Sequence, residues 1–231
     1  MTDATPVLLA GNMCDARLWT AEVRAALPGA VDADLARDDT IEVMARRALD
    51  AAEGAVLPVG FSMGGIVALA MARLAPKRIA GLVLLDTNPG ADLPERATVR
   101  PRQQADVRAG ALERVVVEEL KPNYLATANR GNVAFLALLR DMALALGPDV
   151  FVRQSEALRT RPDQRDVLPA LAVPVLLACG AEDALCPPEW HRAMAATTCD
   201  ATLEVIEGAG HMLPLEQPQR LAALIRRWRT R

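Results

Sequence analysis

The stretch Gly60-Phe61-Ser62-Met63-Gly64-Gly65 decides the fold of this chain. It follows an apolar run, residues 55–59, and leads into an alanine-rich segment that ends at Pro76, so a Gly-x-Ser-x-Gly pentapeptide joins an expected strand to an expected helix. A sharp turn of this kind strains the serine backbone and lifts the hydroxyl clear of the sheet, while the flanking glycines keep side chains out of the crowded crossing. The spacing therefore predicts that Ser62 is a nucleophile.

Two later stretches place an acid and a base after other expected strands. Residues 173–179 form an apolar run typical of a buried strand, and Asp183 ends the Gly-Ala-Glu-Asp sequence that follows it. Residues 202–206 are expected to form the last strand, and the small-residue loop after it leads to His211. We predict Asp183 as the acid and His211 as the base of a triad whose chain order is serine, acid, histidine.

With these residues the chain resembles the α/β-hydrolase family, in particular its small lidded members: enol-lactonases, carboxylesterases and cofactor-free haloperoxidase-like enzymes. The resemblance is carried by residues 60–65, 173–188 and 208–218, and by Leu8-Leu9-Ala10-Gly11-Asn12, which is similar to the family's first-strand loop. It covers most of the chain outside about residues 92–167. It implies an α/β-hydrolase fold, with a mostly parallel six-stranded sheet, helices on both faces and a helical lid.

The resemblance also implies a serine hydrolase that cleaves a carboxylic ester or lactone through an acyl-enzyme. Ser62 would attack the carbonyl carbon, His211 would take the serine proton, and Asp183 would orient the imidazole. The backbone N–H groups of Asn12 and Met63 would stabilise the oxyanion. This chemistry needs neither a metal nor an organic cofactor, and the expected partner is a small-molecule ester or lactone.

Two other functions are compatible with the same residues. The triad could hydrolyse a carbon–carbon bond or carry out cofactor-free perhydrolysis, and a relative of this fold could bind a ligand without catalysis. Because a serine, an acid and a histidine are all present, the sequence favours an enzyme over a binding protein.

Several residues have competing interpretations. Asp86 ends another apolar strand and is the second candidate for the acid; we favour Asp183 and interpret Asp86 as a loop-capping residue beside the site. The thiol of Cys186 lies near the acid loop, but as a nucleophile it would need the histidine assigned to Ser62. The other histidine, His191, falls in a polar helical stretch and is expected to be solvated.

The composition bounds the class of protein. At 231 residues and 52% hydrophobic, the chain is long enough to bury a full core, and we expect one domain over residues 1–231. A net charge of -3 with interspersed basic and acidic residues gives no electrostatic basis for binding nucleic acid. No signal peptide or membrane anchor is recognised, so a cytoplasmic protein with reduced cysteines is expected. The sequence leaves the oligomeric state open.

Apolar runs that alternate with helical patterns predict a parallel sheet covered on both faces. The expected strands are residues 7–9, 31–35, 56–61, 79–85, 173–179 and 202–206. Residues 31–35 would form an edge strand, and Pro58 should cause a local irregularity because it cannot donate a ladder hydrogen bond. We expect a helix over residues 41–53 capped by Thr40, and a terminal helix from Pro218 to about residue 229.

Residues 92–167 are too many for an ordinary crossover and are expected to form a helical lid. Helical periodicity in this segment suggests apolar faces that pack on the core and roof the site. Phe135, Leu138 and Met142 are the candidate pocket residues. Since aromatic residues make up only 3% of the chain, a mainly aliphatic pocket is expected.

Overall fold

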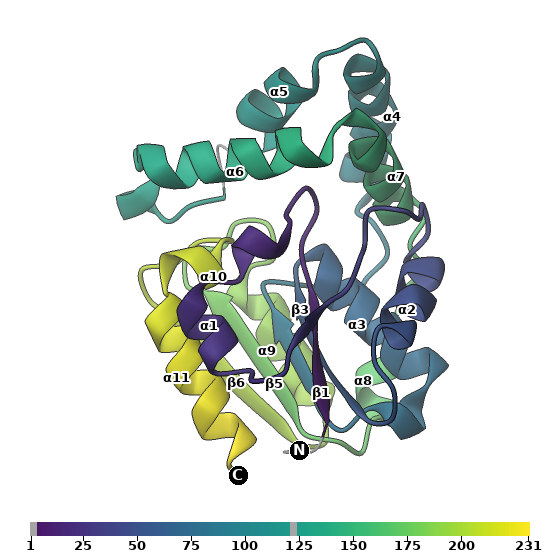
Figure 1. Ribbon diagram of the computed structural model, residues 1–231, viewed down its shortest axis with the longest axis vertical. Helices are drawn as coiled ribbons and strands as arrows, with labels where there is room; N and C mark the ends of the chain where they lie inside the picture. The colour runs from purple at the N-terminus through teal and green to yellow at the C-terminus, as the bar shows by residue number, and fades with distance from the viewer. Residues whose placement is uncertain (1–3, 121–123) are drawn as a thin grey trace.

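The computed structural model describes residues 4–120 and 124–231 and contains a six-stranded, all-parallel sheet between two layers of helices (Figure 1). The strand order is β2-β1-β3-β4-β5-β6. The strands are β1 (Thr5–Leu9), β2 (Val31–Asp32), β3 (Val56–Phe61), β4 (Leu82–Leu85), β5 (Val175–Gly180) and β6 (Ala201–Ile206). The expected fold class is confirmed, and β2 is an edge strand as expected, although it is much shorter than residues 31–35.

The helices of the two outer layers divide the core between them. One layer contains α1 (Ala21–Ala25) and α11 (Pro218–Arg229), and the other contains α2 (Ile41–Asp50), α3 (Met63–Leu74), α8 (Val167–Ala170) and α9 (Pro188–Thr197). Short helical turns complete the core domain: η1 (Ala16–Leu18), η2 (Pro76–Arg78) and α10 (Leu213–Glu216). The expected start of α2 after the Thr40 cap and the terminal helix from Pro218 are confirmed.

Alternation along the inner strands explains why their sequences are apolar on both faces. In β4, Leu82 and Leu84 pack in the cluster that contains α2 and α3, whereas Val83 and Leu85 pack in the cluster that contains α1 and α11. Successive side chains of a strand point to opposite faces, and both faces here are covered. The inner strands β3, β4 and β5 are therefore fully buried, whereas the edge strands β2 and β6 are partly exposed.

The irregularity expected at Pro58 lies in the pairing of β3 with β4. Pro58 pairs in register with Val7 of β1, but towards β4 an isolated bridge joins Val56 to Ile79 before regular pairing begins at Val59 and Val83. The residue offset between the two strands is 23 at the bridge and 24 at the regular pair, so one extra residue is inserted on the β4 side. Regular β4 consequently begins at Leu82 rather than at residue 79.

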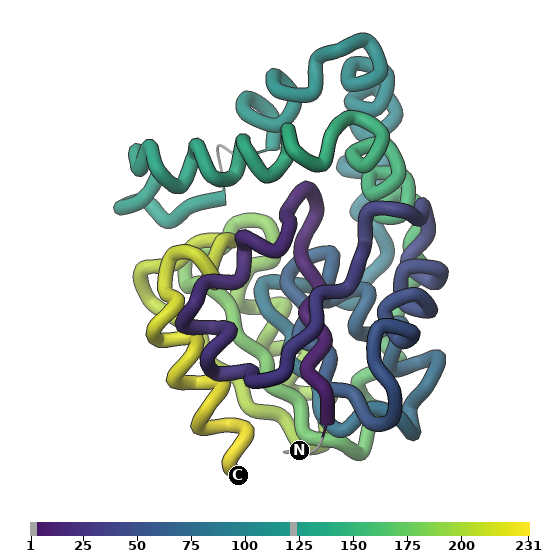
Figure 2. The backbone as a smooth tube through the Cα atoms, in the orientation of Figure 1, coloured from purple at the N-terminus to yellow at the C-terminus, as the bar shows by residue number. Residues whose placement is uncertain are grey.

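The long connection between β4 and β5 is helical and lies beyond the carboxyl ends of the strands (Figures 1 and 2). It contains α4 (Pro94–Arg108), α5 (Leu112–Arg114), the π-helix η3 (Val115–Leu120), η5 (Thr127–Asn129), α6 (Val133–Leu146) and α7 (Pro148–Arg159). These helices have an apolar cluster of their own, which includes Val107, Val115 and Phe151 and also takes in Met13 from the loop after β1. Among the described residues, no helix combines the length and the apolar character that crossing a membrane requires.

Candidate active site

Ser62 lies in the sharp turn between β3 and α3. Its backbone has φ 53° and ψ -116°, and its N–H donates to the carbonyl of Leu85 at 2.9 Å. A non-glycine residue in this region of backbone space is strained, and the surrounding contacts hold it there. A Cβ on Gly60 would come within 2.4 Å of the Gly64 carbonyl oxygen, so the glycines are required by the close approach of strand and helix.

The structure brings Ser62, His211 and Asp183 together in one hydrogen-bonded row. His211 Nε2 is 3.0 Å from Ser62 Oγ, and His211 Nδ1 is 2.9 Å from Asp183 Oδ2. The other Asp183 oxygen accepts the backbone N–H groups of Leu185 at 2.8 Å and Cys186 at 3.0 Å. Burial alone raises the pKa of the Asp183 carboxyl, but the facing His211 and these N–H groups outweigh it and hold that pKa below its ordinary value.

Asp86 does not contact the histidine. It is fully buried after β4, has φ 45°, and its Oδ1 accepts the N–H of Gly180 at 2.9 Å. Burial raises the pKa of the Asp86 carboxyl well above its ordinary value, and the nearby charge of Asp183 adds to the rise. Of the two candidate acids, the one that meets the imidazole is Asp183, and Asp86 holds the start of the acid loop through Gly180.

The loop that carries His211 is fixed from two sides. The rings of Phe61 and Tyr124 lie against the imidazole, with ring centroids 5.2 Å and 5.6 Å away. Glu216, which the sequence analysis did not select, accepts the N–H of Gly210 at 2.7 Å and that of Ala126 at 2.7 Å. The Glu216 carboxylate therefore links the loop that carries His211 to the helical connection between β4 and β5.

The backbone N–H groups of Asn12 and Met63 are available at the cavity. Both residues line the cavity that contains Ser62, and within residues 4–120 and 124–231 no hydrogen bond occupies either N–H. The neighbouring Met13 has φ 53°, and its N–H is occupied by Gln154 Oε1 at 2.8 Å. Gln154 is a second residue that the sequence analysis missed, because its partners are about 140 residues away in the chain.

We expect Gln154→Leu to impair turnover. Gln154 Oε1 also accepts from the Asn12 side chain at 3.1 Å, and its Nε2 donates to the Leu35 carbonyl at 3.2 Å. A leucine side chain makes none of these hydrogen bonds, so the loop that carries the Asn12 N–H is no longer held in place. Leaving these buried groups unpaired should cost about 1–3 kcal/mol of stability, and we expect kcat/KM for an ester to fall by roughly 10-fold or more.

The control for this prediction is Gln104→Leu, measured by the same kinetics and thermal unfolding. Gln104 is also buried and donates to the Ser155 hydroxyl at 3.3 Å, between α4 and α7 and away from the loop after β1. The Gln104→Leu variant should lose about as much stability as Gln154→Leu but keep kcat/KM near the wild-type value. Equal effects of both variants on kcat/KM would contradict a specific role of Gln154.

The expectation that His191 is solvated is wrong. Its side chain is completely buried, its Nε2 accepts the N–H of Thr87 at 3.1 Å, and its Nδ1 faces the carbonyl of Pro187 at 3.4 Å. Since Nε2 accepts, the proton of the neutral ring is on Nδ1. The polar neighbours Glu189 and Arg192 are exposed, whereas α9 packs His191 against the loop after β4. The local sequence pattern does not show this packing.

Burial lowers the pKa of His191 from 6.5 to about 4, and this predicts a titration that can be observed. The stability that the neutral ring contributes is fully present above pH 6.5 and is lost as the pH falls through about 4. The chain has two histidines, so NMR titration should give one His191 signal that is unchanged from pH 8 to pH 5, assigned with His191→Asn. A midpoint near 6.5 for that signal would contradict this environment.

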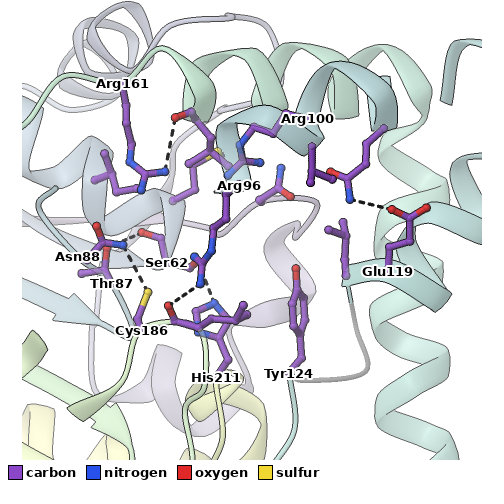
Figure 3. Close-up of a pocket in the computed structure, with 18 of the residues that line it drawn as sticks. Ser62, Thr87, Asn88, Arg96, Arg100, Glu119, Tyr124, Arg161, Cys186 and His211 are labelled. Carbon is purple, nitrogen blue, oxygen red and sulfur yellow. Dashed lines mark hydrogen bonds between the residues drawn. The ribbon is translucent and has the colours of Figure 1, made fainter. Parts of the chain in front are cut away.

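The cavity beside Ser62 has a volume of ≈ 450 Å³ and is more polar than the sequence suggested (Figure 3). Its walls come from the loop after β1, the elbow, α4, η3 and α7, and they include Arg96, Arg100 and Arg161. Aliphatic side chains such as Ile66 and Leu158 also line it, so the expectation of a mainly aliphatic pocket is incomplete because it leaves out the charged part of the wall. The candidate pocket residues of α6 are not among those that line it: Met142 is fully buried in the main core, and Phe135 and Leu138 pack against that core.

Asp183, Cys186 and His211 form the only group within the described ranges whose ligand atoms could hold a metal ion, all within 4.8 Å of one another. Two of these atoms already bond each other, Nδ1 of the histidine and Oδ2 of the aspartate. Burial raises the pKa of the Cys186 thiol, which favours its neutral form over the thiolate that metals bind. The arrangement therefore suits proton transfer better than metal binding.

Comparisons with known proteins agree with this fold. Residues 7–224 match the model of the alpha/beta hydrolase family, so the chain belongs to that family. A pimeloyl-[acyl-carrier protein] methyl ester esterase from Neisseria meningitidis is 28% identical over 206 residues, which cover 87% of this chain and 79% of that protein.

Two solved structures illustrate the similarity in three dimensions. An esterase from Thermogutta terrifontis, solved with malate bound, is 32% identical and superimposes with a TM-score of 0.89 over 98% of this chain and 90% of its own. The enol-lactonase from Burkholderia xenovorans LB400 is 22% identical, with a TM-score of 0.82 over 99% of this chain and 92% of its own.

Proposed function

We propose that this protein is a serine hydrolase that cleaves a carboxylic ester through an acyl-enzyme intermediate. The observation that carries the proposal is the unbroken row of hydrogen bonds from Asp183 through His211 to Ser62, with Ser62 held in a strained turn at a cavity. The names of the relatives at 28% and 32% identity, both esterases, favour ester hydrolysis over carbon–carbon cleavage or ligand binding.

The proposed chemistry follows from the positions of the atoms. His211 Nε2 accepts the Ser62 proton as Oγ attacks the carbonyl carbon, and it later returns the proton to the leaving alcohol. The carboxylate of Asp183 keeps the other imidazole proton on Nδ1 and stabilises the imidazolium that forms. The unoccupied N–H groups of Asn12 and Met63 receive the oxyanion. Water then attacks the acyl-enzyme: His211 Nε2 takes a proton from this water and gives it to Ser62 Oγ as the carboxylic acid is released.

We also propose that residues 92–167 act as the lid of this site. The support is that α4, η3 and α7 all contribute to the walls of the cavity that contains Ser62, while the sheet contributes only its carboxyl edge. A cover of this kind excludes water from the reacting atoms and positions the substrate.

The experiment that tests the proposal is labelling with a fluorophosphonate probe followed by mapping of the labelled residue. The chain has two serines, and Ser155 is buried in α7, so Ser62 should be the single labelled position. Ser62→Ala should abolish both labelling and the turnover of p-nitrophenyl butyrate, whereas Ser155→Ala should retain both. A folded wild-type protein that neither reacts with the probe nor turns over any ester would contradict the proposal.

A further inference from the structure

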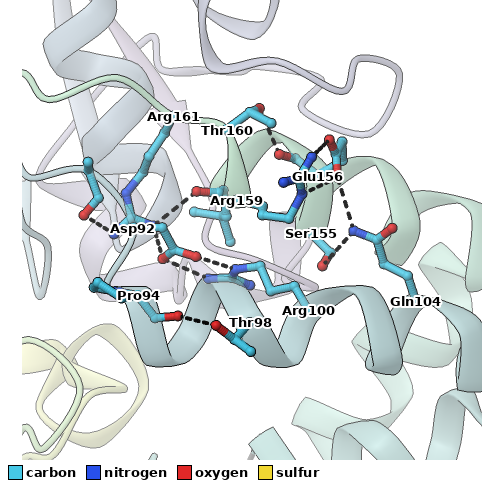
Figure 4. A network of polar contacts seen from close by, with 12 residues as sticks. Asp92, Pro94, Thr98, Arg100, Gln104, Ser155, Glu156, Arg159, Thr160 and Arg161 are labelled. Carbon is cyan, nitrogen blue, oxygen red and sulfur yellow. Dashed lines mark hydrogen bonds and ion pairs between the residues drawn. The ribbon is translucent and has the colours of Figure 1, made fainter.

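Three arginines line the cavity beside Ser62, and two of them share one carboxylate. Arg100 Nε lies 2.7 Å from Asp92 Oδ2, and Arg161 Nη1 lies 2.8 Å from Asp92 Oδ1 (Figure 4). The side chains of Asp92 and Arg161 are only 2% and 3% exposed, so this cluster is shielded from solvent ions. Two positive charges against one negative charge leave one positive charge in excess in this wall of the cavity.

Arg96 provides a further positive charge, and within the described residues no carboxylate pairs with it. The hydrogen bond of its guanidinium goes to the main-chain carbonyl of Leu185, at 3.1 Å. Figure 3 shows this side chain extending from α4 into the cavity, with its guanidinium directed toward Ser62, Cys186 and His211. Among residues 4–120 and 124–231, no acceptor is found for the remaining N–H groups of Arg96, which lie next to the proposed reacting atoms.

The acidic residues of the cavity do not cancel this charge. Glu119 is paired with Arg102 and with Arg114, and the hydrogen bond from Arg102 is the main reason that its pKa falls to about 2. Glu95 is exposed to solvent, where water and salt screen its charge. The chain as a whole has a net charge of -3, so the positive charge in the cavity is a local feature rather than a property of the surface.

We propose that the ester cleaved by this protein carries a carboxylate group, and that Arg96 binds this carboxylate. The claim rests on the proposed ester hydrolysis and narrows its substrate class. A guanidinium donates two parallel N–H groups to a carboxylate, and such charge-assisted bonds are strong in a cavity that excludes water. An anion arriving beside Arg96 also balances the excess charge of the Arg100, Arg161 and Asp92 cluster behind it.

Matched substrate pairs test the proposal, because each pair differs by the replacement of a methyl group with a carboxylate. Monomethyl glutarate against methyl pentanoate places the charge in the acyl half of the ester, and γ-acetoxybutyrate against butyl acetate places it in the alcohol half. The quantity measured is the ratio of kcat/KM for the charged ester to that for the neutral ester. In the wild type we expect a ratio above 1 for at least one pair.

Substitutions at Arg96 show whether this residue causes the preference. Arg96→Gln should lower the ratio by roughly 10- to 100-fold, as expected for the loss of one charge-assisted pair. Arg96→Lys, which keeps the charge but not the planar fork, should restore part of it. The matched control is Arg108→Gln, because Arg108 is an exposed residue at the end of the same helix and does not line the cavity. For Arg108→Gln the ratio of kcat/KM for the charged ester to that for the neutral ester should equal the wild-type ratio.

A binding measurement separates this inference from the proposed activity. In Ser62→Ala protein, glutarate binding measured by calorimetry should weaken by at least about 10-fold when Arg96→Gln is added. Failure of fluorophosphonate labelling would reject the hydrolase mechanism, whereas glutarate binding that does not depend on Arg96 would reject the anion site. A wild-type enzyme that prefers the neutral ester in both pairs, or an Arg96→Gln ratio equal to that of the wild type, would also overturn the proposal.

Discussion

Asp183→Asn is expected to lower kcat for ester hydrolysis by about 10⁴-fold while the protein remains folded. The asparagine oxygen can still accept the N–H groups of Leu185 and Cys186, so the acid loop keeps its shape. The asparagine amide, however, can donate to His211 Nδ1, which moves the imidazole proton to Nε2. In that tautomer Nε2 cannot accept the proton of Ser62, and catalysis loses its base.

The matched control is Asp86→Asn, compared by steady-state kinetics and by thermal unfolding. The raised pKa of Asp86 already favours a neutral side chain there, and an asparagine oxygen can accept the Gly180 N–H as Oδ1 does now. We therefore expect a loss in kcat of less than about 10-fold for this variant. If Asp86→Asn impaired turnover more than Asp183→Asn, Asp86 and not Asp183 would be the acid of the triad.

Gly64→Ala should destabilise the protein more than any other small substitution at the elbow. A Cβ at this position would lie 1.9 Å from the carbonyl oxygen of Leu9, which belongs to β1. The group that the Cβ meets is backbone, and the Cβ itself is fixed to the backbone of α3, so relief requires α3 to move away from β1, and this would open the core on that face of the sheet. Overpacking that cannot relax around a flexible side chain is expected to cost more than about 3 kcal/mol.

Chemical denaturation of Gly64→Ala and Gly131→Ala measures this effect. A Cβ on Gly131 meets nothing within 4 Å, so that variant should unfold at the wild-type denaturant concentration. Gly64→Ala should unfold at a clearly lower concentration or fail to accumulate as folded protein. A midpoint equal to that of the wild type would show that the elbow does not pack against β1 as described.

The sheet could be predicted from the sequence because its information is local. Runs of consecutive apolar residues identify the inner strands, which are covered on both faces, and the structure confirms six parallel strands in all. The ends of the strands differ from the expected bounds. β2 has only two residues and β4 starts three residues later than residue 79, because pairing with neighbours, and not the apolar run, decides where a strand ends.

The helical segment was predicted as a unit, but its contribution to the cavity was not. Helical periodicity predicts which side of a helix is apolar, whereas the residues of this segment that line the cavity include the polar side chains of Arg96, Arg100 and Gln103 on α4. Phe135, Leu138 and Met142 follow the predicted periodicity but pack toward the main core. The direction in which a helix turns its polar face depends on its packing partners, and the sequence of the helix alone does not specify them.

By itself the sequence determined the class of fold, the strained turn at Ser62 and the identity of the candidate acid and base, because glycine spacing and apolar runs act over a few residues. Only the tertiary structure decided which carboxylate meets His211, how Gln154 and Glu216 fasten the surrounding loops, and that Arg96 enters the cavity. Those features join residues that are far apart in the chain. Their energies depend on burial and distance, which exist only once the layers have packed.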